Sequence, residues 1–367
     1  MATRIVHVGL IGCGEVAQVI HIPNLLHMNS FFRITHLCDV SPSSLSHCAT
    51  KIPNPDLKTT ASADDLCADP EVEVVMVVNS DEYHAEHVVL ALAHDKHVLI
   101  EKPVALTRRD VQKVLDAEKK SKGRVMVGYM RRYAMVFEDA VEEIGGMDRI
   151  DYARVRDIIG SNSFFVDQSG TFPIKPSDFS AEDTQGRTQR AEEQVKTAMA
   201  EVGGGVPVND ETTRMWRLLG GLGSHDLSLM REAIGMPDRV VGSSLGTPFW
   251  NALLKYPTFT VSYESGIDNI PRFDAHIEIY SASKSVRVQY DTPYVKGLPI
   301  TMHVSENANG AYKETTIRKT YEDPYTIELR KLYGMVVRGD SVKTTVADAM
   351  DDLVLFGMIM RHHYGTS

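Results

Sequence analysis

Glu101, Lys102 and Pro103 stand at the end of the apolar run HVLIE (97–101), where a carboxylate, an amine and a rigid ring follow one another. In α/β sheets, ligands bind at the carboxyl ends of the strands, so an amine at such an end would face a ligand rather than open water. Pro103 restricts Lys102 to an extended backbone, which fixes the direction of its side chain. We expect Lys102 to donate a hydrogen bond to a substrate hydroxyl or carbonyl oxygen. The alternative is a strand end whose charges simply meet water.

A glycine-rich motif, GCGEVA at 12–17, follows the first apolar run. It has the pattern GxGxxA between a predicted strand and a predicted helix, which is the context of a dinucleotide-binding turn. In such a turn Gly12 allows the tight bend, Gly14 lets the backbone approach a pyrophosphate, and Ala17 keeps the helix close to the strand. Glu15 and Val16 begin the helix, whose free N–H groups favour phosphate. The motif therefore predicts NAD(P) binding, and a plain strand–helix turn is the alternative.

Asp39 ends the second apolar run and follows Gly14 by 25 residues, close to the usual spacing of the acid that binds a ribose 2′-hydroxyl. An aspartate repels a 2′-phosphate, and no Arg or Lys follows within ten residues. NAD is therefore favoured over NADP, which stays open. The alternative for Asp39 is a helix N-cap. The other predicted cofactor residues come from later strand ends and one helix: Asn79, His84, Glu101 and Lys102. The alternative for His84 is to cap or pack its own helix.

Five Val/Ile-rich runs, each continuous rather than alternating, divide the first 126 residues: 4–11, 32–40, 72–79, 97–101 and 124–129. Parallel strands that are buried on both faces have this composition. Helical patterns lie between them, at 15–28, 41–51, 63–68, 82–95 and 107–121. Alternating strands and helices predict an α/β fold, with a doubly wound parallel sheet of the Rossmann type in a first domain at 1–126.

Residues 127–367 have a different pattern of apolar and polar residues. The chain length also favours two domains. YARVRDIIG (152–160) and the stretch 239–305 contain partly alternating strands. These predict a largely antiparallel sheet with one face packed on helices. Residues 161–210 form a polar insertion with a charged helix at 188–202, which the three glycines at 203–205 are expected to end.

His225 lies in GSHDLS, where Ser224 resembles a helix N-cap and 225–234 a helix. A helix N-terminus disfavours the imidazolium, so the ring would stay neutral and able to accept a proton. This suits a general base that works near neutral pH. The alternative, of equal weight on chemistry alone, is a histidine that only hydrogen-bonds the backbone at the start of its helix.

The segments GLIGCGEVA, DEYHAEHVVLALAHDKHVLIEKPVALT and VGYMRRY resemble the Gfo/Idh/MocA oxidoreductases, named for glucose–fructose oxidoreductase and inositol dehydrogenase. The resemblance spans residues 4–137 and continues more weakly in LLGGLGSHDLSLMREAIG (218–235). It implies a Rossmann domain, a second α/β domain with a large open sheet often used for oligomerisation, and NAD(P)-dependent hydride transfer on sugars, cyclitols or related alcohols. It also implies that Lys102 and His225 flank the reacting carbon, with Lys102 on the oxygen and His225 as the base.

The chain departs from the family pattern around the histidine. Many relatives carry an acid four residues before it, where Gly221 stands, and an aspartate three residues after it, where Ser228 stands. Asp226 is adjacent to His225 but about 100° away around a helix. Three acids of the insertion are candidates to replace the missing one: Asp167, Asp178 and Asp210.

Two other functions fit the same cofactor site. An NAD-dependent glycosidase or epimerase makes no net redox change, and the missing acid at Gly221 would fit its altered proton handling. A regulatory protein could instead sense NAD without catalysis, although the presence of both Lys102 and His225 argues against it. Cofactor turnover distinguishes the glycosidase or epimerase from a dehydrogenase, because a dehydrogenase consumes NAD stoichiometrically and an enzyme that recycles its NAD does not.

Tyr129, Arg131 and Arg132 follow the predicted strand at 124–129, at the expected domain junction. Paired arginines can bind a carboxylate or phosphate through several N–H donors. These three residues, together with Asp226, are therefore candidate substrate contacts. The alternative for the arginines is a solvated helix start.

Composition narrows the partners. The net charge of -10 disfavours nucleic acid, since phosphate binding needs a basic face. Four cysteines without CxxC spacing fit a reducing compartment, and no HxH or HExxH pattern suggests a metal. The N-terminus resembles a strand rather than a signal peptide, and no run approaches the roughly 20 apolar residues that span a bilayer. We expect a cytoplasmic homodimer or homotetramer, assembled through the C-terminal sheet, that acts on a small polyol or sugar, with no nucleic-acid or membrane partner and no metal.

Overall fold

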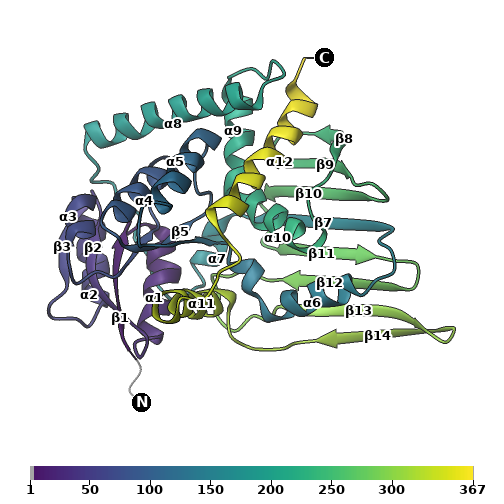
Figure 1. The fold of residues 1–367 in the computed structure, drawn as a ribbon, viewed down its shortest axis with the longest axis horizontal. Coiled ribbons are helices and arrows are strands. Elements are labelled where there is room, and N and C mark those ends of the chain that lie inside the picture. The colour runs from purple at the N-terminus through teal and green to yellow at the C-terminus, as the bar shows by residue number, and fades with distance from the viewer. Residues whose placement is uncertain (1–3, 367) are drawn as a thin grey trace. The chain divides into compact units, whose positions relative to one another are not determined.

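The computed structural model describes residues 4–366 (Figure 1). The chain forms two compact units. The first comprises residues 4–128 together with Gly170–Ala198 and Glu328–Asp351, and the second comprises Tyr129–Ser169, Met199–Ile327 and residues 352–366. Segments from beyond residue 170 are therefore part of the first unit.

A six-stranded sheet forms the centre of the first unit. Its strands in the described residues are β1 (Val6–Ile11), β2 (Phe32–Cys38), β3 (Lys58–Thr60), β4 (Val74–Val77), β5 (His97–Glu101) and β6 (Val125–Gly128). Their order is β3-β2-β1-β4-β5-β6, and every pairing is parallel. Every residue of β4 and β6 is buried, which explains their continuous apolar sequence. The predicted Rossmann fold is confirmed; β3 is absent from the prediction because it is short, polar and at the sheet edge.

Helices connect these strands as the sequence predicts. They are a π turn (Ala17–His21) that continues into α1 (Ile22–His27), α2 (Pro42–Lys51), α3 (Ala63–Ala68), a 3₁₀ turn (Asp81–Tyr83) before α4 (His84–Ala93), and α5 (Arg108–Glu118). Ser41, Ser62 and Thr107 accept hydrogen bonds from backbone N–H groups three residues on, and so cap α2, α3 and α5. These caps set the starting points of the helices that follow the strand ends.

An eight-stranded sheet forms the second unit. Its strands are β7 (Tyr152–Gly160), β8 (Arg239–Ser244), β9 (Phe249–Lys255), β10 (Thr260–Asp268), β11 (Phe273–Tyr280), β12 (Lys284–Tyr290), β13 (Thr301–Ala308) and β14 (Ala311–Ile317). They follow the order β14-β13-β12-β11-β7-β10-β9-β8. The central pair β7 and β10 is parallel, and the other pairs are antiparallel. The predicted, mostly antiparallel sheet is confirmed.

Helices cover one face of this second sheet. Along the sheet in Figure 1, α6 (Met135–Gly145) packs on β12 and β13, and α10 (Ser224–Ile234) packs on β7 and β11. The unit also contains a 3₁₀ turn (Met130–Tyr133), α7 (Asn162–Val166), α9 (Asp210–Leu218) and a π turn (Leu219–Gly223). α11 (Pro324–Arg338) and α12 (Val346–Tyr364) each contribute residues to both units.

The insertion is more ordered than its polar sequence suggests. Its helix α8 (Ala181–Val202) begins seven residues before the predicted start at 188. Gly203, Gly204 and Gly205 then have φ of 70°, 65° and 69°. This left-handed conformation suits glycine and ends the helix, as predicted. Residues 170–180, which precede α8, belong to the first unit.

Candidate functional site

The glycine motif forms a tight turn between β1 and the first helix. Gly12 has φ 108°, and its N–H donates to the Cys38 carbonyl of β2 at 2.8 Å. A Cβ at Gly12 would lie 2.6 Å from the Asn79 backbone nitrogen, so both the conformation and the space require glycine. A Cβ at Gly14 would meet nothing within 4 Å among the described residues. The backbone at Gly14 is thus open to a ligand, as a pyrophosphate-binding turn needs.

Asp39 is hydrogen-bonded to this turn. Its Oδ2 accepts from the Cys13 N–H at 2.7 Å, and its Oδ1 accepts from the Ser41 N–H at 2.8 Å. The alternative reading of Asp39 as a helix N-cap is wrong, because Ser41 caps α2 through the Ser44 N–H. Asp39 is half-buried, so its carboxylate remains reachable beside the turn.

The remaining residues of the glycine motif lie in the first turn of the helix that follows Gly14. The Gln18 N–H donates to the Gly14 carbonyl at 3.0 Å, so the helix begins directly after the glycines. Glu15 and Val16 are half-buried in this first turn, and Ala17 is fully buried. The predicted helix start is confirmed, with a π turn at Ala17–His21 that the sequence does not signal.

Glu101 is not a solvated strand end. Its Oε1 lies 2.9 Å from His21 Nε2, and its Oε2 accepts from the Lys102 N–H at 3.2 Å. Burial alone would raise the pKa of Glu101, but the His21 hydrogen bond and the nearby positive charges lower it, so the carboxylate is ionised. Lys102 is half-buried, and the Lys102–Pro103 peptide bond is cis. The buried carboxylate therefore fixes the backbone from which Lys102 projects.

His84 contacts the backbone rather than an open site. Its Nδ1 lies 2.7 Å from the Pro103 carbonyl oxygen and its Nε2 3.1 Å from the Asn79 carbonyl oxygen, and the ring is buried. This geometry favours the packing alternative over direct contact with a cofactor. His84 joins the ends of β4 and β5, and so holds Asn79 next to the residues around Pro103.

The arrangement fits a dinucleotide. Asn79 Nδ2 is 3.1 Å from His87 Nδ1, whereas Asn79 Oδ1 is a buried acceptor with no partner among the described residues. Buried polar atoms usually have partners, so this one has capacity for a ligand. With the open backbone at Gly14 and the Asp39 carboxylate, the first unit offers a ribose acceptor, a phosphate cradle and a further polar group at one sheet edge.

His225 lies in the second unit, and the structure corrects its expected setting. Ser224 does not cap a helix: its Oγ donates to the Gly220 carbonyl at 2.7 Å. The helical run begins at Asp210, capped by Asn209, and passes through the π turn Leu219–Gly223 into α10 without a break. His225 therefore has helical turns on both sides, and the predicted helix-end dipole does not act on its half-buried ring.

The acid next to His225 belongs to a buried ionic cluster. Arg131 Nη1 donates to Asp157 Oδ2 at 3.0 Å and also to Asp226 Oδ1. All three residues are at most 4% exposed. Burial and the charge of Asp157 raise the pKa of Asp226 well above its usual range against the opposing effect of Arg131. The cluster is neutral when Asp226 keeps its proton, which reduces the cost of burying it.

Arg132 and Tyr129 are also committed to internal contacts. Arg132 Nε donates to Glu232 Oε2 at 2.5 Å, and its guanidinium lies 5.7 Å from the Tyr129 ring centroid. Tyr129 OH donates to Asp352. A solvated helix start is wrong for both arginines, which are at most 4% exposed. The expected substrate contacts of Tyr129, Arg131, Arg132 and Asp226 gain no support from this geometry, because their polar groups are buried in ion pairs and hydrogen bonds within the unit.

Sequence reasoning missed several residues that build these two sites. The buried position of Asp157 could have been suspected from the sequence, because it is the one acid in the apolar end of the strand YARVRDIIG. His21 and Gln18 carried no such signal, because a polar residue in a helix pattern normally faces solvent. Lys102 belongs to the first unit and His225 to the second, and their predicted convergence stays a prediction.

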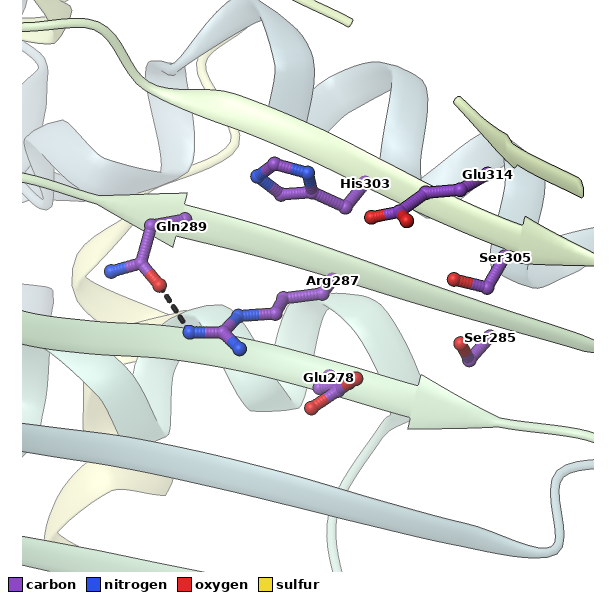
Figure 2. A pocket seen from close by; sticks show the side chains of 7 residues that line it. All are labelled: Glu278, Ser285, Arg287, Gln289, His303, Ser305 and Glu314. Carbon is purple, nitrogen blue, oxygen red and sulfur yellow. Dashed lines mark hydrogen bonds between the residues drawn. The ribbon is translucent and has the colours of Figure 1, made fainter. Parts of the chain in front are cut away.

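The second unit also has a polar depression of about 370 Å³ on the open face of its sheet (Figure 2). Its lining comes from β11 to β14: Glu278, Ser285, Arg287, Gln289, His303, Ser305 and Glu314. Arg287 donates to Gln289 across its floor. Within residues 4–366 there is no group of three or more His, Cys, Asp or Glu side chains that could hold a metal ion. No helix in this range is long and apolar enough to span a membrane.

Comparison with known proteins identifies the N-terminal part of the first unit. Residues 6–129 match the Gfo/Idh/MocA family, an oxidoreductase family with an NAD-binding Rossmann fold. Inositol 2-dehydrogenase from Salmonella paratyphi B is 35% identical over 126 residues, and that from Gluconacetobacter diazotrophicus 37% over 128 residues. Each match covers 34% of this chain and only 37% of the relative. The family resemblance predicted from the sequence is confirmed, and the sequence match carries it over this N-terminal part.

Solved structures share the fold over nearly the whole chain. A levoglucosan dehydrogenase in complex with NADH and levoglucosan has a TM-score of 0.72 at 17% identity, and covers 97% of this chain and 96% of its own. A 3-ketoreductase from Actinomadura kijaniata, in complex with NADP and TDP-benzene, has a TM-score of 0.68 at 16% identity and covers 96% of each chain. At this identity the likeness establishes the two-part fold and no more.

Proposed function

We propose that the protein is an NAD-dependent oxidoreductase that transfers a hydride between the nicotinamide and a secondary alcohol or carbonyl of a sugar, cyclitol or related compound. The observation that carries the proposal is the hydrogen-bonded unit formed by the glycine turn and Asp39. It combines a phosphate cradle with a ribose acceptor on a sheet of the NAD-binding family. Bound NAD supplies the hydride chemistry, and the protein binds, orients and moves protons. NADP use remains the less favoured alternative.

Lys102 is the proposed donor to the substrate oxygen. It follows Glu101, whose ionised carboxylate is held by His21, and precedes Pro103, whose carbonyl is held by His84. These contacts fix the backbone on both sides of the lysine. A fixed ammonium stabilises negative charge on the substrate oxygen as the proton leaves.

His225 is the proposed general base, and the proposal requires it to meet Lys102 at the reacting carbon. Support comes from its match to the family histidine and from its half-buried ring. The helix that carries it is anchored one residue on by the Asp226–Arg131 contact. That anchor restrains the position of His225 without a direct contact to the reacting atoms.

The roles of the two predicted domains follow from these residue roles, with residues 170–198 and 328–351 of the second domain lying in the first structural unit. We propose that residues 1–126 bind the cofactor and that residues 127–367 bind substrate and mediate assembly, as a homodimer or homotetramer through the eight-stranded sheet. Exposed apolar side chains on β8 and β9, which a second copy would cover, support this assembly: Val241, Phe249 and Leu253. Analytical ultracentrifugation of the wild type and of Leu253→Glu tests it, with dissociation of the variant expected. The four buried free thiols support a reducing, cytoplasmic location.

The decisive test is a panel of sugars, cyclitols and sugar acids, each offered with NAD and with NADP while reduced nicotinamide is followed by absorbance. We expect stoichiometric NAD reduction with at least one polyol or sugar. If a substrate is converted while NAD is neither consumed nor accumulated as NADH, the enzyme is a glycosidase or epimerase instead. The absence of an acid at Gly221 is the observation that favours this second candidate.

Two variants test the proposed roles. Lys102→Ala and His225→Gln should each lower kcat about 10²-fold or more, since a positioned acid–base group contributes on that scale. NADH affinity should change little in His225→Gln. Cofactor binding that persists together with full activity in both variants would remove these residues from the mechanism. Cofactor binding without any turnover in the wild type would favour an NAD sensor.

A further inference from the structure

Residues 170–180 of the insertion, here called the strap, are hydrogen-bonded to the cofactor-binding part of the first unit. Gln18 Oε1 accepts from the Ile174 N–H at 2.8 Å, and Gln18 Nε2 donates to the Ile174 carbonyl at 3.2 Å. The same Gln18 amide donates to the Cys13 carbonyl at 2.8 Å. Since Cys13 is the middle residue of the glycine turn, the strap is tied directly to the motif that would hold the pyrophosphate.

Asp178 of the strap reaches the start of α2. Its Oδ1 accepts from Ser41 Oγ at 2.6 Å and from Ser43 Oγ at 2.9 Å, and its Oδ2 accepts from the Ser43 N–H at 2.9 Å. The hydrogen bond from Ser41, followed by those from Ser43, lowers the pKa of Asp178 to about 2. Asp178 is exposed and therefore carries a full negative charge at neutral pH.

The group of donors that Asp178 occupies is an anion site by its chemistry. A helix N-terminus presents free N–H groups and the positive end of the helix dipole, and two serine hydroxyls stand beside it. This site begins two residues after Asp39, whose Oδ1 accepts from the Ser41 N–H. A ribose whose 2′-hydroxyl is bound by Asp39 would direct a 2′-phosphate toward the same serines. With Asp178 in place, that phosphate meets a second carboxylate instead of free donors.

We propose that Asp178 is a specificity-determining residue: its carboxylate fills the anion-binding start of α2 and, together with Asp39, excludes the 2′-phosphate of NADP. The inference rests on the proposed NAD-binding function. It assigns to the strap a role in selecting the cofactor, in place of the candidate role of Asp178 in a proton relay. Like charges placed opposite one another in a binding site are a common means of rejecting the wrong ligand.

A purely structural role for Asp178 makes a different prediction. If its only task were to fasten the strap to α2, Asp178→Asn would keep most of that task, because the amide oxygen still accepts from one side of the helix start and asparagine also caps helices. The amide NH2 group replaces only the second accepting oxygen. Asn and Asp would then select cofactors equally. If the negative charge of Asp178 is what excludes NADP, Asp178→Asn should weaken the preference for NAD over NADP while the fold is retained.

The experiment measures dissociation constants of NADH and NADPH by calorimetric titration for the full chain and three variants: Asp178→Asn, Asp178→Ala and Asp56→Asn. Asp56 is a matched control, since it is an exposed acid that lies beyond the opposite end of α2. Thermal unfolding of each variant checks that the fold persists. Because binding is measured without turnover, the result does not depend on the substrate.

The wild type should bind NADH more tightly than NADPH. Asp178→Asn should lower the ratio of the NADPH dissociation constant to the NADH dissociation constant by about tenfold or more, because one negative charge that opposes the 2′-phosphate is lost. Asp56→Asn should leave the ratio unchanged. An unchanged ratio in both Asp178 variants, or a wild type that prefers NADPH, would overturn the inference. A wild type that binds neither nucleotide would instead refute the proposed function itself.

Discussion

Two glycine-rich segments of this protein, residues 12–14 and Leu219–Gly223, fold in opposite ways. At the first, Gly12 takes a φ of 108° and the chain turns sharply from a strand into a helix. At the second, the chain stays helical, and Gly223 has φ -59° and ψ -30°. Glycine allows both outcomes, so composition alone does not decide between them.

The surroundings of each segment make the choice. A Cβ at Gly12 would lie 2.6 Å from the Asn79 backbone nitrogen, so the neighbouring strand end leaves room only for glycine in the turn. A Cβ at Gly221 would meet nothing within 4 Å in the described part of the chain. There the helix is already established from its capped start at Asn209, and the glycines continue it. Gly12 is therefore needed for space and conformation, whereas the helical backbone and open surroundings of Gly221 would accept a side chain.

The two segments are also held in place differently. The glycine turn is held by backbone groups, by the half-buried carboxylate of Asp39 and by the Gln18 amide, which donates to the Cys13 carbonyl. The helix that carries His225 is fixed by the buried cluster of Arg131, Asp157 and Asp226. The glycine turn therefore depends mainly on backbone geometry, whereas the helix that carries His225 depends on buried charges that neutralise one another. Four substitutions test this difference.

The largest effect is expected from Arg131→Met. It leaves Asp157 and Asp226 buried together without their cation, and breaking a buried ion pair in this way costs about 3–5 kcal/mol of stability. Arg149→Met is a control that breaks a mostly exposed pair with Asp151 and should cost at most about 1 kcal/mol. Urea unfolding of both variants measures the difference. Equal losses would show that the cluster does not hold the second region.

Gly12→Ala should destabilise the protein by about 2 kcal/mol, because an alanine would be forced into positive φ and against the Asn79 backbone. Gly14→Ala is the matched control, since its Cβ meets no described atom within 4 Å. Thermal unfolding should therefore be almost normal in Gly14→Ala, whereas its NADH affinity should fall when the Cβ blocks the pyrophosphate. Normal stability of Gly12→Ala would contradict the steric account of the turn.

Asp226→Asn should change how stability depends on pH. The pKa of Asp226 is raised by burial and by Asp157, so the folded state retains a proton that the unfolded state loses near its ordinary pKa of 3.8. The stability from this group is thus complete below that value and is lost as pH rises toward the folded pKa, by up to about 1.4 kcal/mol per pH unit. An asparagine does not ionise. In urea unfolding from pH 4 to 8, the free energy of unfolding of the variant should rise relative to that of the wild type as pH increases. A difference in unfolding free energy that stays constant with pH would refute the raised pKa.

The smallest effect is expected from Gly221→Ala, with the opposite sign. An alanine in an open helical position stabilises by about 0.5–1 kcal/mol relative to glycine. Thermal unfolding should show a small rise in Tm with NADH affinity unchanged. A large loss would mean that Gly221 is needed for backbone freedom after all, and that the two glycine segments are more alike than their conformations suggest.

The local features of the cofactor unit were predictable from the sequence. The runs around Val74–Val77 and His97–Glu101 are continuous and apolar because both faces of a parallel strand are buried. The helices α2 and α5 begin within one residue of their predicted starts at 41 and 107. The setting of His225 was not predictable in this way. A serine before a histidine after several glycines has the pattern of a helix start, and only the surrounding helix overrides it.

The sequence by itself determined the alternation of strands and helices, the glycine turn and the acid that follows it, because backbone preference and hydrophobic period act over a few neighbouring residues. The tertiary structure decided that residues 170–198 join the first unit, that Asp178 meets Ser41 and Ser43, and that Arg131 is buried between two acids. These contacts join residues that are tens to more than a hundred positions apart in the chain. Their energy depends on burial and on which charges meet, and neither can be read from the spacing of residues along the sequence.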